Sequence, residues 1–593
     1  MTSAVQSAGR TLLDTLPPEG HAQDSACMFE RHADGWQPMT TAAWRDEVTL
    51  LALGLRYIGL RRGDRVGLLG RSSPHWIVMD LAIMSAGGVT VPVFARGSSA
   101  RLRHQIHDCG MRFLLVESPQ VLALAESSAN LLHAIVCRGV KGSGARRYDY
   151  DALLLHGRAE MMRNPAAFEE LVAALREDDL ATIIYTSGST GEPKGVELTQ
   201  RNIFSQLRGA AERFVVDPAS VALSFLPLAH VFERMIVYSY LDRGVPIYFV
   251  DDLQQVGTCM REVRPTVMTT VPRLLEKIHD RIVAQVELTD GLKGRLAAWA
   301  LSKAEDDEPH EGSASAVDVM ADRLMYSRFR DGMGGRLQIV VCGGAPLAPE
   351  LCRFFLNIGV PLYNGYGLTE SSPVLCANYP GANRMGTVGL PFPDVELRLA
   401  DDGVLEARGP NIMRGYHGRP ADTAAVLDAD GWLNTGDRAS IDPDGFVTIT
   451  GRAKELFKTS TGKYVCPIPI EQALRNDALI DMAAVIADNR KFVTCLLFPD
   501  GEAVRRMRER RGAAEGMDLL NGAELRDYMK TRIERINAGL EDWERIRAWR
   551  FVADPPTVEN EQLTPTAKLR RHVIEDVHRE LINSMYEQEH ERK

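Results

Sequence analysis

Apolar and polar positions alternate along the first part of the chain in a way that predicts strands and helices in turn. Residues 63–70 combine a turn signal with a short apolar run, 74–86 fit a helix with proline in its first turn, and 89–93 fit a second strand. A strand, a helix and a strand at this spacing form a βαβ unit, so a parallel sheet is expected. Further strands are expected at 111–117, 180–184, 222–225, 247–250, 267–270 and 337–342.

The pattern changes after residue 385, where short β-rich pieces are separated by turn signals. Strands expected at 395–399, 403–407 and 446–450 suggest a small antiparallel subdomain. Residues 301–318, rich in Asp, Glu, Ser and Gly, are expected to form an exposed or loosely ordered insertion. We therefore predict an α/β protein. Its large N-terminal domain, residues 1–452, has parallel and mixed sheets flanked by helices and carries the small β subdomain, and a smaller α+β C-terminal domain covers residues 453–593.

Length and composition limit the class of protein. A chain of 593 residues is expected to divide into roughly two to four folding units, and its 45% hydrophobic and 25% charged content is ordinary for a globular protein. The net charge of −10 argues against nucleic acid as the main partner. A basic run at 505–511 is interpreted as a solvated helix face, and a patch for acidic phospholipid or polyphosphate is the alternative.

Cysteine usage and apolar runs bear on the compartment. The nine cysteines are scattered without a C-x-x-C pair, which argues against structural zinc or disulfides and favours a reducing compartment. No signal peptide is expected, and the longest apolar stretches, such as 77–84, contain Asp80 and are too short to span a bilayer. The protein is therefore expected in the cytoplasm, and the sequence leaves peripheral contact with the inner face of the membrane open.

The segment 185–196, Y-T-S-G-S-T-G-E-P-K-G-V, is the most informative part of the chain. An apolar strand precedes it, and glycine allows its backbone N–H groups to wrap around phosphate while Lys194 adds a compact positive charge. The alternative is a flexible linker, but a linker needs neither the strand nor the lysine. The loop does not match the Walker A pattern. Its candidate phosphate-binding residues are Thr186, Ser187, Gly188, Ser189, Thr190, Gly191 and Lys194.

Four later motifs narrow the interpretation. N-G-Y-G-L-T-E spans 364–370, D-G-W-L-N-T-G-D spans 430–437, G-R stands at 451–452, and L-T-P-T-A-K spans 563–568. With the loop at 185–196, their order resembles that of the adenylate-forming acyl-CoA synthetases, the superfamily that also holds firefly luciferase and peptide-synthetase adenylation domains. L-P-L-A-H-V-F-E-R at 226–234, G-G-A-P-L at 343–347 and the charged insertion before Arg336 are similar to its long-chain fatty acid branch.

The resemblance implies two half-reactions that use ATP, Mg²⁺ and coenzyme A. A fatty acid and ATP first give an acyl-adenylate and pyrophosphate, and the coenzyme A thiol then gives acyl-CoA and AMP. The first step brings two anions together, so positive charge must be placed in advance.

The resemblance also assigns catalytic roles. Lys568 is expected to bridge the carboxylate and the α-phosphate, Glu370 and Thr190 to hold Mg²⁺, and Thr369 to contact the α-phosphate. His230 is expected near the acyl carboxylate. The alternatives are a surface lysine, a surface carboxylate and a structural histidine. Lys458 is expected to act in the second step.

Nucleotide and coenzyme A contacts follow from the same matches. Asp437 is expected to accept hydrogen bonds from the ribose hydroxyls, with an Asx-turn as the alternative, and Arg452 to contact the ribose. Tyr366 is expected to stack on adenine, with a core tyrosine as the alternative. The remaining expected nucleotide contacts are Gly343, Gly344, Ala345, Asn364, Gly365 and Gly367. The resemblance places the hinge of a mobile C-terminal domain at Lys454 and pantetheine beside Gly462.

The sequence thus predicts an AMP-forming long-chain fatty acid–CoA ligase whose partners are small molecules. Asn434 and Ile449 depart from many relatives, and the acyl tunnel cannot be assigned by residue, although a helix at 232–241 is a candidate wall. Two alternatives stay open: a fatty acyl-AMP ligase that loads a carrier protein, and a catalytically silent protein that binds fatty acid or nucleotide. The sequence gives neither the preferred chain length nor the oligomeric state.

Overall fold

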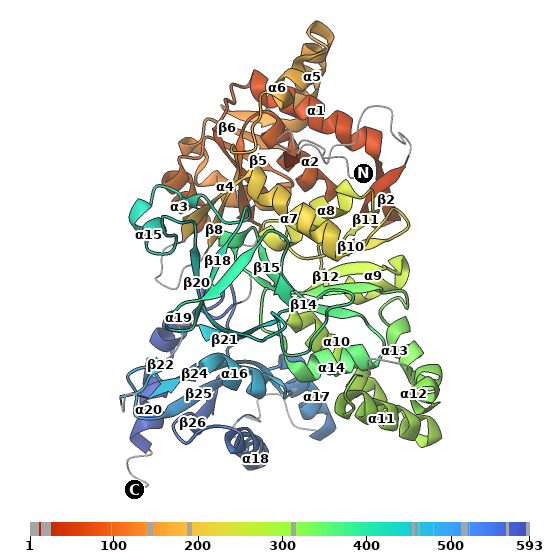
Figure 1. Cartoon of the computed structure of the whole chain (residues 1–593), viewed down its shortest axis with the longest axis vertical. Helices are drawn as coiled ribbons and strands as arrows, with labels where there is room; N and C mark the ends of the chain where they lie inside the picture. The colour runs from red at the N-terminus through yellow and green to blue at the C-terminus, as the bar shows by residue number, and fades with distance from the viewer. Residues whose placement is uncertain are drawn as a thin grey trace. The chain divides into compact units, whose positions relative to one another are not determined.

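The computed structural model describes residues 11–12, 25–95, 98–139, 146–186, 193–309, 316–452, 457–460, 463–477, 479–511, 520, 522–564 and 568–588. The chain divides into two compact units (Figure 1), the first comprising residues 1–435 and 440–448 and the second residues 436–439 and 449–593. The chain crosses from one unit to the other within β20 (Leu433–Ile441) and again within β21 (Val447–Arg452). The predicted boundary after residue 452 and the predicted mobility stay predictions.

An eight-stranded sheet in the first unit carries the phosphate-loop strands. Its order is β19-β9-β8-β4-β3-β5-β6-β7, and the strands from β8 to β7 run parallel, whereas β9 is antiparallel to β8 and β19 to β9. The parallel core is buried and apolar, as expected for strands covered on both faces. The strands are β3 (Arg65–Gly70), β4 (Val89–Phe94), β5 (Phe113–Val116), β6 (Ala134–Cys137), β7 (Arg147–Asp149), β8 (Leu180–Thr186), β9 (Lys194–Thr199) and β19 (Gly415–Tyr416).

A nine-stranded sheet completes the frame of the first unit. Its order is β16-β15-β14-β13-β12-β10-β11-β1-β2, with a parallel centre from β14 to β1 and antiparallel strands at both edges. The strands are β1 (Ala26–His32), β2 (Gly35–Thr40), β10 (Ala222–Ser224), β11 (Ile247–Phe249), β12 (Val267–Thr270), β13 (Ile339–Cys342), β14 (Leu362–Gly367), β15 (Val374–Ala377) and β16 (Leu390–Pro391). In the small β subdomain, β17 (Glu396–Leu399) and β18 (Val404–Arg408) pair antiparallel, as predicted.

Helices cover the sheets of the first unit, and α1 packs against α2 and α5 (Figure 1). The helices are α1 (Thr41–Tyr57), α2 (Pro74–Ser85), α3 (Ser99–Cys109), α4 (Pro119–Glu126), α5 (Tyr150–Arg163), α6 (Ala167–Ala173), α7 (Gln200–Arg213), α8 (Val231–Asp242), α9 (Val256–Val263), α10 (Pro272–Glu287), α11 (Gly291–Asp306), α12 (Ala316–Ala321), α13 (Ser327–Asp331), α14 (Pro349–Asn357) and α15 (Pro420–Ala424). Short helical turns lie at Ala129–Leu131, Asp322–Tyr326 and Thr369–Ser371 (η4).

The expected insertion at 301–318 is more regular than predicted. Helix α11 continues to Asp306, and α12 begins at Ala316. The reason is that Ala297, Ala300 and Ala304 recur at helical spacing and are buried, so one face of α11 packs despite its acidic end.

The second unit is built on a three-stranded sheet. In it, β24 (Ile480–Ile486) and β25 (Val493–Pro499) pair antiparallel, and β26 (Ile546–Phe551) runs parallel to β25. Alternate residues of β24 and β25 enter two different hydrophobic clusters, one with α16 and α18 and one with α19 and α20. The other elements are β22 (Phe457–Lys458), β23 (Tyr464–Val465), α16 (Pro467–Arg475), α17 (Gly501–Arg511), α18 (Ala523–Ala538), α19 (Arg571–Val577) and α20 (Arg579–Gln588).

These units confirm the predicted fold class, an α/β protein with a large N-terminal part and a smaller C-terminal part. Among the described residues, no helix combines the length and the apolar content that crossing a bilayer requires.

Candidate active site

The predicted phosphate loop joins two paired strands. Strands β8 and β9 form an antiparallel pair in which Thr186 lies opposite Lys194, so both residues stand where the strands meet the loop. The hydroxyl of Tyr185 donates to Asp108 Oδ2 at 2.6 Å and so anchors the end of β8 to α3. The other predicted loop residues, Ser187, Gly188, Ser189, Thr190 and Gly191, lie outside the described residues.

Lys194 and Glu370 both contact Tyr416. The Lys194 ammonium is 5.2 Å from the centre of the Tyr416 ring and 3.1 Å from Asp422 Oδ1. The Tyr416 hydroxyl donates to Glu370 Oε1 at 2.9 Å. Burial and the adjacent Glu370 carboxylate both raise the pKa of Tyr416, so the phenol stays a neutral donor. The structure therefore brings together a predicted phosphate ligand and a predicted metal ligand from distant parts of the sequence.

Two glycine-rich segments lie at the carboxyl ends of neighbouring parallel strands, one directly after β13 and one within β14. Cys342, at the end of β13, pairs with Asn364 in β14, so Gly343, Gly344 and the 364–367 segment lie at the carboxyl ends of the two strands. This is the edge at which α/β sheets bind ligands. A Cβ on Gly343 would lie 3.3 Å from the Phe232 ring and 3.5 Å from the Gly365 carbonyl oxygen, which shows how closely the two segments and α8 approach. Ala345 follows these glycines in the chain, and Tyr366 pairs with Cys376 in β15.

The turn that carries Thr369 and Glu370 is held by main-chain bonds. Met413 N–H donates to the Glu370 carbonyl oxygen at 2.9 Å, and the Asn411 side chain donates to Ser371 O at 2.9 Å. Gly367 must be glycine, because a Cβ there would lie 1.8 Å from the Pro373 carbonyl oxygen. The backbone around Glu370 is thus tightly fixed.

Helix α8 begins at the predicted histidine. His230 is its N-cap, and its Nδ1 accepts from Phe232 N–H at 3.2 Å, which is the structural role considered as the alternative. Its predicted role near the acyl carboxylate stays a prediction.

The first turn of α8 carries buried ionisable groups that sequence reasoning missed. Glu233 accepts from Ser224 Oγ at 2.6 Å and from Thr269 Oγ1 at 2.5 Å, and burial raises its pKa to about 7. Arg234 makes a two-bond pair with Asp80 at 2.6 and 2.8 Å, and both side chains are almost fully buried. The sequence signal for these buried groups was the presence of charged residues in otherwise apolar helices.

The remaining predicted site residues belong to the second unit. Asp437 is 3% exposed, and Arg452 Nε lies 3.0 Å from its Oδ1, so the structure brings these two predicted ribose contacts together. Lys458 is exposed in β22, with its N–H donating to Asp488 Oδ1 at 3.3 Å. Lys568 is exposed, its carbonyl oxygen accepts from Thr564 N–H at 2.8 Å, and its N–H donates to Thr564 Oγ1 at 3.0 Å. Lys454 and Gly462 lie outside the described residues.

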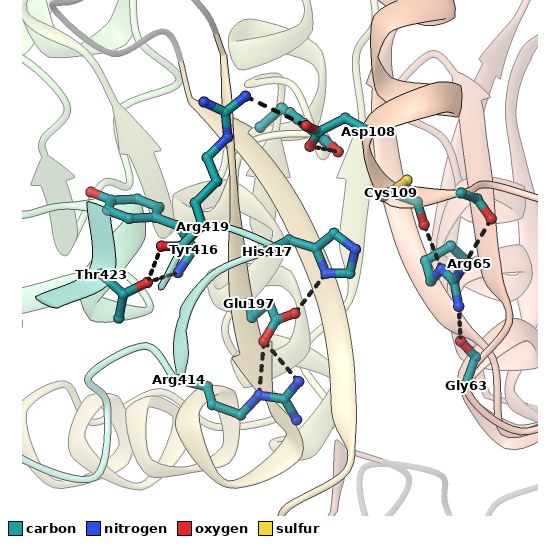
Figure 2. Close-up of polar contacts among 12 residues, drawn as sticks. Gly63, Arg65, Asp108, Cys109, Glu197, Arg414, Tyr416, His417, Arg419 and Thr423 are labelled. Atoms are coloured by element: carbon teal, nitrogen blue, oxygen red, sulfur yellow. Dashed lines mark hydrogen bonds and ion pairs between the residues drawn. The ribbon is translucent and has the colours of Figure 1, made fainter. Parts of the chain in front are cut away.

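A cleft of about 370 Å³ opens at the other end of the eight-stranded sheet. Its lining includes the first residues of β3, β4 and β8, so it lies at the amino ends of these strands, whereas Thr186 lies at the carboxyl end of β8. Two ion pairs lie within its lining: Arg62 contacts Asp179 at 2.6 Å and Arg414 contacts Glu197 at 2.7 Å (Figure 2 shows the second pair).

Comparison with known proteins identifies the family. The AMP-binding enzyme family matches residues 18–417, and the AMP-binding enzyme C-terminal domain matches residues 455–590. The chain therefore belongs to the AMP-binding enzyme family.

Individual relatives agree with this assignment. The chain is 33% identical over 575 residues to the long-chain-fatty-acid–CoA ligase FadD15 of Mycobacterium tuberculosis, covering 95% of this chain and 94% of the relative. It is 27% identical to the long-chain-fatty-acid–[acyl-carrier-protein] ligase AEE15 of Arabidopsis thaliana, covering 95% of this chain and 85% of the relative. The adenylation domain of a carboxylate reductase from Mycobacterium chelonae has the same fold, with a TM-score of 0.73 at 21% identity over 98% of this chain and 92% of that domain.

Proposed function

We propose that the protein is an AMP-forming long-chain fatty acid–CoA ligase. The observation that carries the proposal is the cluster of Lys194, Tyr416 and Glu370, which joins a cation from the phosphate loop to a carboxylate from the turn after β14. Family membership and the similarity to FadD15 over nearly the whole chain support the substrate class.

The proposed reaction has two balanced steps. A carboxylate oxygen of the fatty acid attacks the α-phosphorus of ATP, a new P–O bond forms, and pyrophosphate leaves with the electrons of the broken P–O bond. The sulfur of coenzyme A then attacks the acyl carbon, its proton is released, and AMP leaves with the electrons of the C–O bond. AMP is a far better leaving group than oxide, and this is the chemical reason for spending ATP.

Each charge has a proposed task. Lys194 neutralises phosphate oxygens, and Lys568 bridges the carboxylate and the α-phosphate. Asp437 and Arg452 hold the ribose, and Tyr366 with Gly343, Gly344 and Ala345 encloses adenine. Asn364, Gly365 and Gly367 supply backbone beside the nucleotide, Thr369 contacts the α-phosphate, His230 lies near the acyl carboxylate, and Lys458 and Gly462 serve the coenzyme A step.

Glu370 fits Mg²⁺ because a carboxylate beside phosphate oxygens is the donor set this ion prefers. The side chain is oriented by the Tyr416 hydroxyl, and Thr190 is the proposed second protein ligand. When bound, Mg²⁺ would offset the negative charge of the phosphates. The protein groups bind and orient the two anionic substrates.

The test is to incubate the protein with palmitate, ATP and Mg²⁺, with and without coenzyme A, and to measure pyrophosphate and thioester. Both products are expected, the thioester only with coenzyme A. Lys568→Ala is expected to lower pyrophosphate release by roughly 10²–10³, the cost of losing one pre-placed donor. The control is Lys530→Ala, another exposed lysine of the second unit, which should leave the rate unchanged. An unchanged rate in Lys568→Ala contradicts its role.

The similarity to the acyl-carrier-protein ligase AEE15 favours one second candidate, transfer to a carrier protein. Pyrophosphate formed without thioester in the same assay would support that candidate. No pyrophosphate at all would support the silent binding protein. Sedimentation with vesicles of phosphatidylglycerol tests the peripheral contact with the inner face of the membrane that the sequence leaves open.

A further inference from the structure

Tyr416 stands between the two charged side chains to which the proposed function assigns the phosphates and their metal ion. Its ring faces the Lys194 ammonium at 5.2 Å, and its hydroxyl donates to Glu370 Oε1 at 2.9 Å. The three residues come from β9, β19 and η4, which are far apart in the sequence. Tyr416 therefore links the phosphate loop to the turn that carries Glu370.

The position of Tyr416 is fixed by strand pairing. It lies opposite Val196 in the antiparallel pair of β19 and β9, and its N–H donates to Thr423 Oγ1 at 2.9 Å. The main-chain bonds to β9 come from its neighbours, since Arg414 N–H donates to Glu197 O at 3.0 Å and His417 N–H to Gly195 O at 2.8 Å. A tyrosine whose backbone is fixed in this way keeps its hydroxyl in one place, which is the requirement for orienting another side chain.

The buried carboxylate of Glu197 contacts the residues on both sides of β19. Glu197, on β9, contacts Arg414 Nη2 at 2.7 Å and His417 Nδ1 at 2.7 Å, and it is 8% exposed (Figure 2). Arg414 and His417 flank Gly415 and Tyr416 in the chain, so one acidic side chain holds the short strand β19 from both ends. The brace explains why a strand of two residues keeps its register.

We propose that Tyr416 is a positioning residue that orients the Glu370 carboxylate toward a metal ion on the phosphates held by Lys194. The inference rests on the proposed function and deepens it. Groups that hydrogen-bond a metal ligand fix its orientation, and losing such a group costs about 10–100-fold in metal affinity or activity. The hydroxyl has this role, whereas the ring alone would suffice for packing.

The experiment compares Tyr416→Phe with the wild type by isothermal titration calorimetry. The probe is Mn²⁺ titrated into protein saturated with α,β-methylene-ATP, an analogue that cannot release pyrophosphate. We expect Mn²⁺ affinity to fall about 10–100-fold, with the KM for palmitate and the thermal midpoint unchanged. Tyr379→Phe is the matched control, because it also removes a bonded hydroxyl, but one that accepts from Arg213 Nη1 at 2.7 Å instead of donating to a carboxylate.

Wild-type Mn²⁺ affinity in Tyr416→Phe overturns the inference and leaves the proposed function intact. Absence of pyrophosphate release from palmitate and ATP by the wild type overturns the proposed function instead. If Tyr416→Phe does not fold, Glu197→Gln gives the second test, since it removes the charge that braces β19. Weaker Mn²⁺ binding with unchanged palmitate KM in this variant supports the inference, and unchanged Mn²⁺ binding overturns it.

Discussion

The buried carboxyl of Glu233 makes the stability of the first unit depend on pH. Glu233 is 1% exposed, and the side chains that bond it, Ser224 on β10 and Thr269 on β12, are neutral hydroxyls. Removal from water therefore dominates and raises its pKa from 4.5 to about 7. Glu233→Gln replaces the acid by a neutral side chain of the same shape that can still bond both hydroxyls.

The sign follows from proton binding. Between pH 4.5 and about 7 the folded chain keeps a proton that the unfolded chain has released, so stability falls as pH rises through this window and is level above it. The difference between 4.5 and 7, at about 1.4 kcal/mol for each tenfold change, amounts to about 3 kcal/mol. Because Glu233→Gln has no such proton, its stability relative to the wild type should rise by about 2–3 kcal/mol between pH 5 and pH 8.

Urea unfolding at pH 5 and pH 8, followed by tryptophan fluorescence, measures this change. The control is Glu212→Gln, an exposed glutamate of α7, which should show no pH-dependent difference from the wild type. Parallel pH profiles for the wild type and Glu233→Gln would refute the reasoning, since they would mean that Glu233 is ionised in the folded protein or titrates alike in both states.

Two further substitutions test charged contacts. Asp80→Asn leaves the Arg234 guanidinium buried without its charged partner and should cost about 3–5 kcal/mol in urea unfolding; a loss below about 1 kcal/mol would contradict a buried pair. Asp422→Asn removes the carboxylate that competes with phosphate for Lys194. Breaking such a partly exposed pair, worth about 0.2–1 kcal/mol, should lower the KM for ATP by a factor of about 1.4–5. A higher KM would instead show that Asp422 holds the lysine in place.

Local patterns were enough to predict some of the elements that carry the site. The apolar run before Thr186, the glycines of the loop and the lysine after it predicted a strand, a turn and a phosphate ligand. Strand β8 lies where a strand was expected, whereas β9 was not predicted, because Lys194 to Val196 were assigned to the loop. The nucleotide contacts at 343–344 and 364–367 were implied by the family resemblance and not by a local pattern, and the structure places these residues after or within adjacent parallel strands. Strands and helices have hydrophobic periods of 2 and 3.6 residues, and glycines mark turns. These patterns involve residues close together in the sequence, so they can be recognised without the structure.

The contacts between distant segments were decided only by the tertiary structure. Tyr416 reaches Lys194 because β19 pairs with β9 across more than 200 residues, and no local pattern marks that pairing. In the sequence, Glu233 is a charged residue in an apolar helix. Its pKa is raised only because the fold buries it between β10 and β12. The sequence by itself therefore determined the strand before the loop and predicted which residues bind phosphate. Burial and long-range strand pairing determined which side chains orient the predicted ligands and which ionisable groups are removed from water. Both depend on neighbours in space that are distant in the sequence, and only the folded chain brings these together.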